Sequence, residues 1–117
     1  MRLKLQSLSD RGQPRRERLV LKVVADTDVG EYAVLRAFQE SGAPTDLIDG
    51  AYWFPDKHVR AGDLVVLYTK PGSPSEKDLL SGATAHFFYW GEEDPLWETR
   101  RYCPVLLHVD DWHHLRT

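Results

Sequence analysis

Histidine and aspartate side chains near the carboxy terminus have the spacing of a possible metal site. His108 and Asp110 would lie on one face of a strand, which places an imidazole beside a carboxylate. His86 could supply a third ligand if its strand neighbours theirs, because Zn²⁺ accepts nitrogen and oxygen ligands. The spacing matches no standard closed zinc site, and one cysteine cannot build a thiolate site. Metal binding is therefore an alternative hypothesis, and a polar strand end that frays is the simpler interpretation.

The candidate for nucleophilic catalysis is Cys103, the single cysteine. It could pair with His86 or His108, but it directly precedes Pro104 at the start of an expected strand, where cysteine usually packs. The sequence contains no nucleophile elbow and no glycine-rich phosphate loop. We therefore expect no enzymatic activity and no cofactor. A single cysteine also leaves no internal disulfide, which fits a reducing compartment.

Basic residues gather near the amino terminus. Residues 1–22 contain seven Lys or Arg against two acidic residues. Four of them lie in or beside an expected loop: Arg11, Arg15, Arg16 and Arg18. Such residues could contact phosphates and position the protein on nucleic acid. No aromatic run is interleaved with them, and the chain has a net charge of -3, so we favour a solvated loop and keep nucleic-acid binding as an alternative.

Aromatic residues are densest over residues 86–97, which read HFFYWGEEDPLW. Alternation along a strand favours Phe88 and Trp90 in the core and Phe87 and Tyr89 outside, with Trp97 folding back over a sheet end. The alternative is a partner-binding patch formed by exposed aromatic residues, which are favoured at interaction hot spots. Its members would be Tyr89, Trp97 and Trp112, with an acidic rim of Glu92, Glu93 and Asp94.

Composition describes an ordinary globular protein. The 117 residues suit a single domain, and 42% hydrophobic with 28% charged residues excludes a disordered chain. The start has no long apolar segment typical of a secretory signal, and no apolar run approaches the roughly 20 residues of a membrane span. We expect a cytoplasmic protein that does not contact membranes. The basic and acidic ends could attract each other within one chain or between two copies.

Short alternating or β-branched runs dominate the chain and predict strands. They cover residues 2–6, 19–25, 31–38, 51–54, 64–69, 87–90 and 104–110. A short helix over residues 31–40 is an alternative to the third strand. Loops or turns are expected at residues 9–14, 26–30, 41–50, 61–63 and 70–76, where Gly, Pro, Ser and Asp concentrate. The first two strands should pair as a hairpin within residues 1–25.

The order of these segments resembles the lamin-tail domain. The matching residues are the EYAVLR strand at 31–36, the DLIDG turn at 46–50, Phe54, the strand RAGDLVVLYT at 60–69, and Tyr89-Trp90-Gly91 followed by Trp97. The chain departs from the family pattern because no tryptophan follows Gly50, because residues 98–101 replace a polar turn, and because the first 25 residues are longer and more basic. The resemblance covers residues 31–110 and implies an immunoglobulin-like β-sandwich that serves as a non-enzymatic binding or tethering unit.

We therefore predict a single all-β domain over residues 1–117, an immunoglobulin-like sandwich of about seven to nine short, mostly antiparallel strands. The expected core is Leu21, Val23, Val34, Leu47, Phe54, Leu64, Val66, Tyr68, Phe88, Trp90, Leu106 and Val109. The expected function is protein–protein interaction or self-association, through the aromatic and acidic patch or through an exposed edge strand.

Overall fold

The computed structural model describes all 117 residues as an all-β protein with one short 3-10 helix, η1 (Val29–Glu31). The first five strands are β1 (Leu3–Ser9), β2 (Arg18–Val23), β3 (Thr27–Asp28), β4 (Tyr32–Glu40) and β5 (Ala43–Trp53). The other five are β6 (His58–Val59), β7 (Leu64–Tyr68), β8 (Ser75–Asp78), β9 (Thr84–Tyr89) and β10 (Tyr102–His108). The all-β prediction is confirmed, with ten strands in place of the expected seven to nine. None of the helices present is long and apolar enough to cross a membrane.

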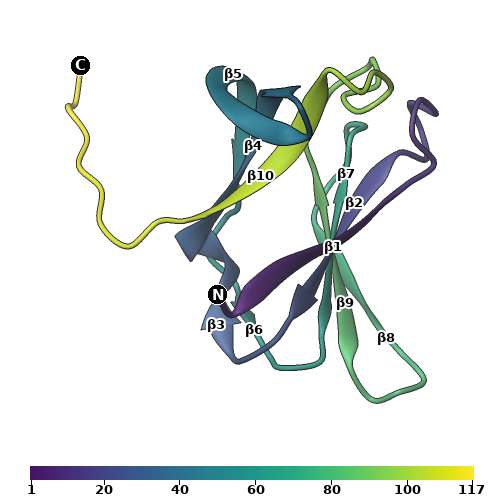
Figure 1. Ribbon diagram of the computed structural model, residues 1–117. Helices are drawn as coiled ribbons and strands as arrows, with labels where there is room; N and C mark the ends of the chain where they lie inside the picture. The colour runs from purple at the N-terminus through teal and green to yellow at the C-terminus, as the bar shows by residue number, and fades with distance from the viewer.

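The strands form two larger sheets and one small one. The five-stranded sheet has the order β1-β2-β7-β9-β8, the three-stranded sheet has the order β10-β4-β5, and β3 pairs with β6. All pairs are antiparallel except β7 with β9, and β1 and β2 form the expected hairpin. Figure 1 shows the two larger sheets on opposite sides of the molecule, with the residues after β10 extending away from both.

The core lies between the inner faces of the two larger sheets. Strands β2, β7 and β9 contribute from one side and β4 from the other, because alternate residues of each strand are apolar. Each such side chain stabilises the fold by about 1.5–3 kcal/mol when it leaves water. The buried cluster is Leu3, Leu19, Leu21, Val23, Val29, Tyr32, Val34, Phe54, Val59, Val65, Leu67, Phe88 and Trp97.

The core prediction is confirmed for some strands and wrong by one residue for β7. Val65 and Leu67 belong to the core cluster, whereas the prediction placed Leu64, Val66 and Tyr68 there. Of these three, Val66 is buried, but on the opposite face of the strand. Residues 64–68 contain no polar residue that would mark the solvent side, so the sequence pattern does not fix the face of this strand. The confirmed members are Leu21, Val23, Val34, Phe54 and Phe88, and Trp90 and Leu106 pack against the cluster.

The longest strand, β5, occupies residues that the sequence assigned mainly to loops. The predicted turn at Asp49-Gly50 is instead a bulge in β5, where the register with β4 shifts and Gly50 adopts a φ of 111°. As part of this strand, Leu47 is 64% exposed, so its assignment to the core is wrong. Residues 75–78, expected to lie in or beside a loop, form edge strand β8. Val109 lies just beyond β10 and is half-buried.

Candidate binding surfaces

The aromatic cluster of β9 and the loop after it serves mainly the core. Phe88 is buried, Trp90 packs against the core, and Trp97 is only 1% exposed, with its ring centroid 6.0 Å from that of Trp90. The alternation argument is therefore confirmed, and the hypothesis of an exposed Trp97 is wrong. The reason is geometric: the loop after β9 turns back over the end of the sheet and inserts Trp97 between the sheets.

The other members of the predicted partner patch do not form one surface. Tyr89 lies on the outer face of the five-stranded sheet, where it stacks on Tyr68 with ring centroids 5.5 Å apart. Trp112 instead packs edge-to-face on Trp53 of the three-stranded sheet, at 5.1 Å. The acidic residues of the rim, Glu92, Glu93 and Asp94, are all exposed in the loop after β9.

The three residues of the metal hypothesis are not brought together. His86 belongs to β9 and His108 to β10, which are strands of different sheets. His108 stacks on Tyr32 with ring centroids 4.9 Å apart, and its Nε2 lies 3.2 Å from Glu31 Oε1. Asp110 is exposed beyond the end of β10. No three His, Cys, Asp or Glu side chains in the chain are placed to hold an ion.

Cys103 also lacks the geometry of a catalytic nucleophile. It is half-buried and pairs with Ala37 across β10 and β4. His108 is five residues further along the same strand and faces the opposite side, where it contacts Tyr32, while His86 lies in the other sheet. Neither of these imidazoles is therefore positioned to take a proton from this thiol.

A buried carboxylate that sequence reasoning missed organises one end of the five-stranded sheet. Glu17 is fully buried and accepts hydrogen bonds from Thr69 Oγ1 at 2.6 Å, from Gly12 N at 2.9 Å and from Leu96 N at 2.7 Å. It also accepts a longer bond from Trp97 N. Because these donors come from three separate segments, Glu17 fixes the loop before β2 against the loop after β9.

The loops that Glu17 holds together form a charged cleft at the same end of the molecule. The cleft has a volume of about 700 Å³ and is open to solvent. One wall comes from the loop before β2, and the other from the segments after β7 and β9. Its lining residues are Gln13, Pro14, Arg15, Arg16, Lys70, Pro71, Glu92 and Glu93. A second, adjoining hollow is lined by Asp10, Arg15, Arg16, Arg18, Tyr68 and Lys70.

Three of the four predicted arginines line this cleft or the adjoining hollow, together with residues the sequence did not single out. Arg15 and Arg16 line both hollows, and Arg18 forms an ion pair with Asp10 at 2.7 Å. Arg11 is used differently, because its Nε donates to the carbonyl of Trp97 at 2.9 Å. The sequence did not identify Lys70 as part of this basic group, because it is the first residue of a Pro/Gly/Ser-rich segment. The strand pairing that brings it to Arg16 is a long-range contact with no local sequence signal.

The opposite end of the five-stranded sheet carries a second buried polar group. Asp63 Oδ2 lies 2.9 Å from His86 Nε2, and the carboxylate accepts the backbone N–H groups of Arg60 and Thr84. Burial raises the pKa of Asp63, but the bond from His86 and the two N–H donors outweigh it, so the pKa lies below its ordinary value. The other nitrogen of His86 has no hydrogen-bond partner and lies 3.7 Å from Glu76 Oε2.

The outer face of the three-stranded sheet is apolar. In the paired registers of β10, β4 and β5, three adjacent rows that face away from the core contain no polar or charged side chain, and the next row, Gln39 with Pro44, ends this apolar stretch. Ile48, Trp53 and Leu107 are 41–48% exposed there. The nine residues of this apolar face are Ala33, Leu35, Ala37, Ile48, Ala51, Trp53, Cys103, Val105 and Leu107. Trp112 adjoins it through its contact with Trp53.

Comparison with known proteins adds no relative. No protein-family model matches the chain, and no curated protein matches it significantly. Functional inference therefore rests on the surfaces described above.

Proposed function

We propose that the protein is a small, non-enzymatic interaction module whose partner is a second copy of itself, bound through the apolar face. The observation that carries this proposal is the composition of that face, with nine apolar residues in three adjacent rows. The solvent side of an antiparallel sheet is ordinarily polar. A contiguous apolar patch on a protein surface marks an interaction site.

A symmetric contact suits this face. In a two-fold dimer the same patch meets itself, so an apolar surface meets an apolar surface and no charged group loses its water. The exposed side chains of Trp53 and Leu107 are the anchors, since large apolar groups carry most of the binding energy. Strand β5 borders the patch, and its second edge is unpaired over 11 residues, which offers additional backbone hydrogen bonds.

We further propose that the fold is a divergent lamin-tail-like sandwich of the immunoglobulin type. Two sheets that share one core support this assignment, as does the order of the segments at β4, β5, β7 and β9. A comparison with this family must also explain two features of the sheets. These are the parallel pairing of β7 with β9 and the separate pair β3-β6. An experimental structure, compared strand by strand with that family, tests the assignment.

The test of self-association is the molar mass in solution over a concentration series, measured by light scattering behind a sizing column. The wild-type mass should rise from that of the 13.5 kDa monomer toward twice that value as concentration increases. The variant Leu107→Glu places a charge within the proposed contact, where burying it without a partner costs several kcal/mol, so it should remain a monomer.

Leu80→Glu is the matched control. Leu80 is fully exposed in the turn after β8 and lies outside the apolar face, so this variant adds the same charge without touching the contact. It should associate like the wild type, and both variants should keep the wild-type far-ultraviolet circular dichroism. A wild-type mass that stays at the monomer value at all concentrations contradicts the proposal.

A further inference from the structure

The outer face of the five-stranded sheet is basic, although the chain as a whole is acidic. Paired registers place Lys4 beside Lys22, and Lys77 lies on the same face through its pairing with Ala85. Arg18 occupies the other end of β2, beside Tyr68. No acidic residue occupies an outward register position on β2, β7 or β9.

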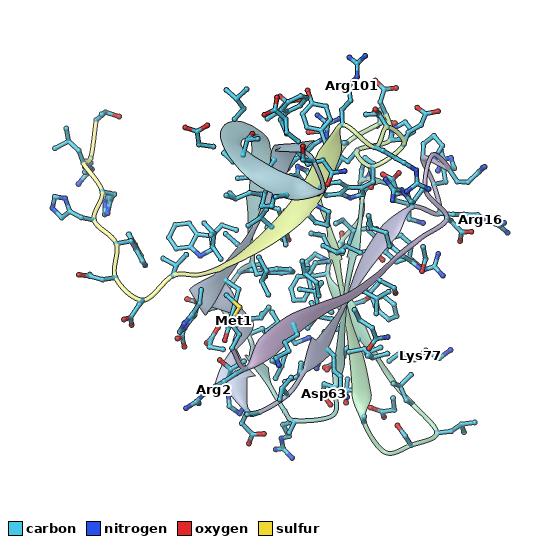
Figure 2. The ribbon with its side chains drawn as sticks, in the orientation of Figure 1. Met1, Arg2, Arg16, Asp63, Lys77 and Arg101 are labelled. Carbon is cyan, nitrogen blue, oxygen red and sulfur yellow. The ribbon has the colours of Figure 1, made fainter.

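The loops at one end extend this basic face. Arg15, Arg16 and Lys70 line the charged cleft, and none of the three side chains makes an ion pair. Figure 2 shows Arg16 and Lys77 projecting from the side of the five-stranded sheet that faces away from the three-stranded sheet. The basic face therefore comprises seven of the 15 Lys and Arg residues in a chain of net charge -3. They are Lys4, Arg15, Arg16, Arg18, Lys22, Lys70 and Lys77.

The middle of the basic face is aromatic and aliphatic. Phe87 lies between Val66 and the edge strand, and Tyr68 stacks on Tyr89 with an interplanar angle of 11°. Lys70 Nζ lies 4.9 Å from the ring centroid of Tyr68, and Gly72 packs so closely on the ring of Tyr89 that a Cβ there would approach it to 2.4 Å. The tyrosines thus present ring edges and hydroxyl groups to a ligand rather than open ring faces.

The spacing of the cations fits a repeating anion. Arg18 and Lys22 are separated by four residues of β2, a rise of about 13 Å at ~3.3 Å per residue. One strand of a nucleic acid duplex carries a phosphate about every 3.4 Å of helix axis, so the separation of these two cations corresponds to about four phosphate repeats along that axis. None of the exposed large hydrophobic residues occupies an outward position on β2, β7 or β9, so this face has no fully exposed apolar side chain to insert into a lipid bilayer.

From this geometry we infer that the basic face binds nucleic acid through its phosphate backbone, independently of base sequence. Arginine and lysine side chains supply the contacts, and the stacked tyrosines supply a flat, half-buried floor. Because the ring faces are covered, affinity comes from counterion release rather than from base stacking. Binding should therefore fall steeply with salt and vary little among oligonucleotides of different base composition.

The experiment measures fluorescence anisotropy of a labelled single-stranded oligonucleotide of about 12 nucleotides over a salt series. The variant Arg15→Ala/Arg16→Ala removes two cations from the charged cleft. Its affinity at low salt should fall roughly tenfold, and the slope of log K against log salt should decrease by about 1.4, the value for two phosphates on a single strand. An affinity of the wild type that does not depend on salt overturns the inference.

Arg100→Ala/Arg101→Ala is the matched control, because it removes two adjacent exposed arginines at a different part of the surface (Figure 2). It changes the net charge by the same amount and should leave affinity within about twofold of the wild type. Equal losses in the two double variants would show attraction to the chain as a whole and would overturn the inference. Vesicles containing phosphatidylserine are the second probe, and binding to them as strong as to the oligonucleotide also overturns it.

The acidic residues of the cleft provide a test in which oligonucleotide affinity should increase. Glu92 and Glu93 face the same cleft as Arg15 and Arg16, so they should repel phosphates. Glu92→Gln/Glu93→Gln should therefore tighten oligonucleotide binding severalfold, whereas a weakening would contradict the inference. The variant Leu107→Glu, on the other sheet, should leave oligonucleotide binding unchanged, which separates this site from the proposed self-association.

Discussion

The two ends of the five-stranded sheet each hold a buried carboxylate, and the two are built differently. Glu17 at one end accepts hydrogen bonds from backbone N–H groups and one hydroxyl, with no charged partner among its hydrogen bonds. Asp63 at the other end accepts two backbone N–H groups and lies against a histidine ring. The first group is held by neutral donors, whereas the second is coupled to another group that can ionise.

The difference also appears in what each carboxylate connects. The partners of Glu17 at Thr69 and Leu96 are 52 and 79 residues away, so it joins loops that are far apart in the sequence, and the bond from Arg11 to the Trp97 carbonyl joins two of the same loops. Asp63 joins the start of β7 to Thr84 and His86, 21 and 23 residues away on the adjacent strand β9. The first network therefore determines the shape of the charged cleft, and the second reinforces a pairing that the sheet already makes.

The largest expected effect is the loss of the Glu17 network. Glu17→Ala leaves several buried donors without an acceptor, and each such donor costs about 1–3 kcal/mol. We expect the free energy of unfolding to fall by about 4 kcal/mol, much of the 5–15 kcal/mol typical of a small domain. Urea denaturation followed by tryptophan fluorescence measures this change, because Trp97 lies in the same network.

Two variants make that measurement specific. Glu40→Ala, at the exposed end of β4, removes a carboxylate of the same type and should change stability by less than about 0.5 kcal/mol. Glu17→Gln keeps one acceptor oxygen and should fall between the two. If Glu17→Ala is as stable as the Glu40→Ala control, the description of Glu17 as the organising group of this end is wrong.

A smaller effect is expected at the other end. Asp63→Asn keeps the shape of the side chain but turns an NH2 group toward Arg60 N or Thr84 N, so one backbone donor loses its acceptor. The expected cost is about 2 kcal/mol, smaller than for Glu17→Ala because the pairing of β7 with β9 still holds these segments together. A cost larger than that of Glu17→Ala would reverse the ranking of the two networks.

The sequence predicted the strands better than it predicted either network. Alternation in β2 identified Leu21 and Val23 as core residues, because Lys22 marks the solvent side. The assignment of Phe88 in β9 to the core was also right, although both of its neighbours are aromatic. The sequence pattern did not identify which face of β7 is buried, because no polar residue interrupts this apolar run. It also did not identify β5 as a strand, because the bulge at Gly50 resembles a turn in the sequence. Periodicity is informative only where the two faces of a strand differ in polarity.

The binding surfaces were harder to predict because they depend on contacts between distant segments. Arg15 and Arg16 were recognisable as a basic group, but the lysines that complete the basic face are isolated in the sequence and meet only through sheet register. Glu17 looked like one acidic residue among arginines, and nothing local signals its burial. The apolar face was missed for the same reason, since β4, β5 and β10 supply its rows from three distant segments.

The smallest expected effect is a pH dependence of stability at the Asp63 end. The pKa of Asp63 is lowered in the folded protein from an ordinary value of 3.8, because its hydrogen bonds outweigh the effect of burial. The unfolded chain therefore binds more protons just below that value, and stability rises with pH there. The contribution of Asp63 is fully present above pH ~4 and is lost as pH falls through the folded pKa. Urea denaturation at about pH 6 and about pH 3 should show the stability gap between wild type and Asp63→Asn narrowing in acid. A gap that stays constant would show that Asp63 acts only through its shape, as a neutral acceptor would.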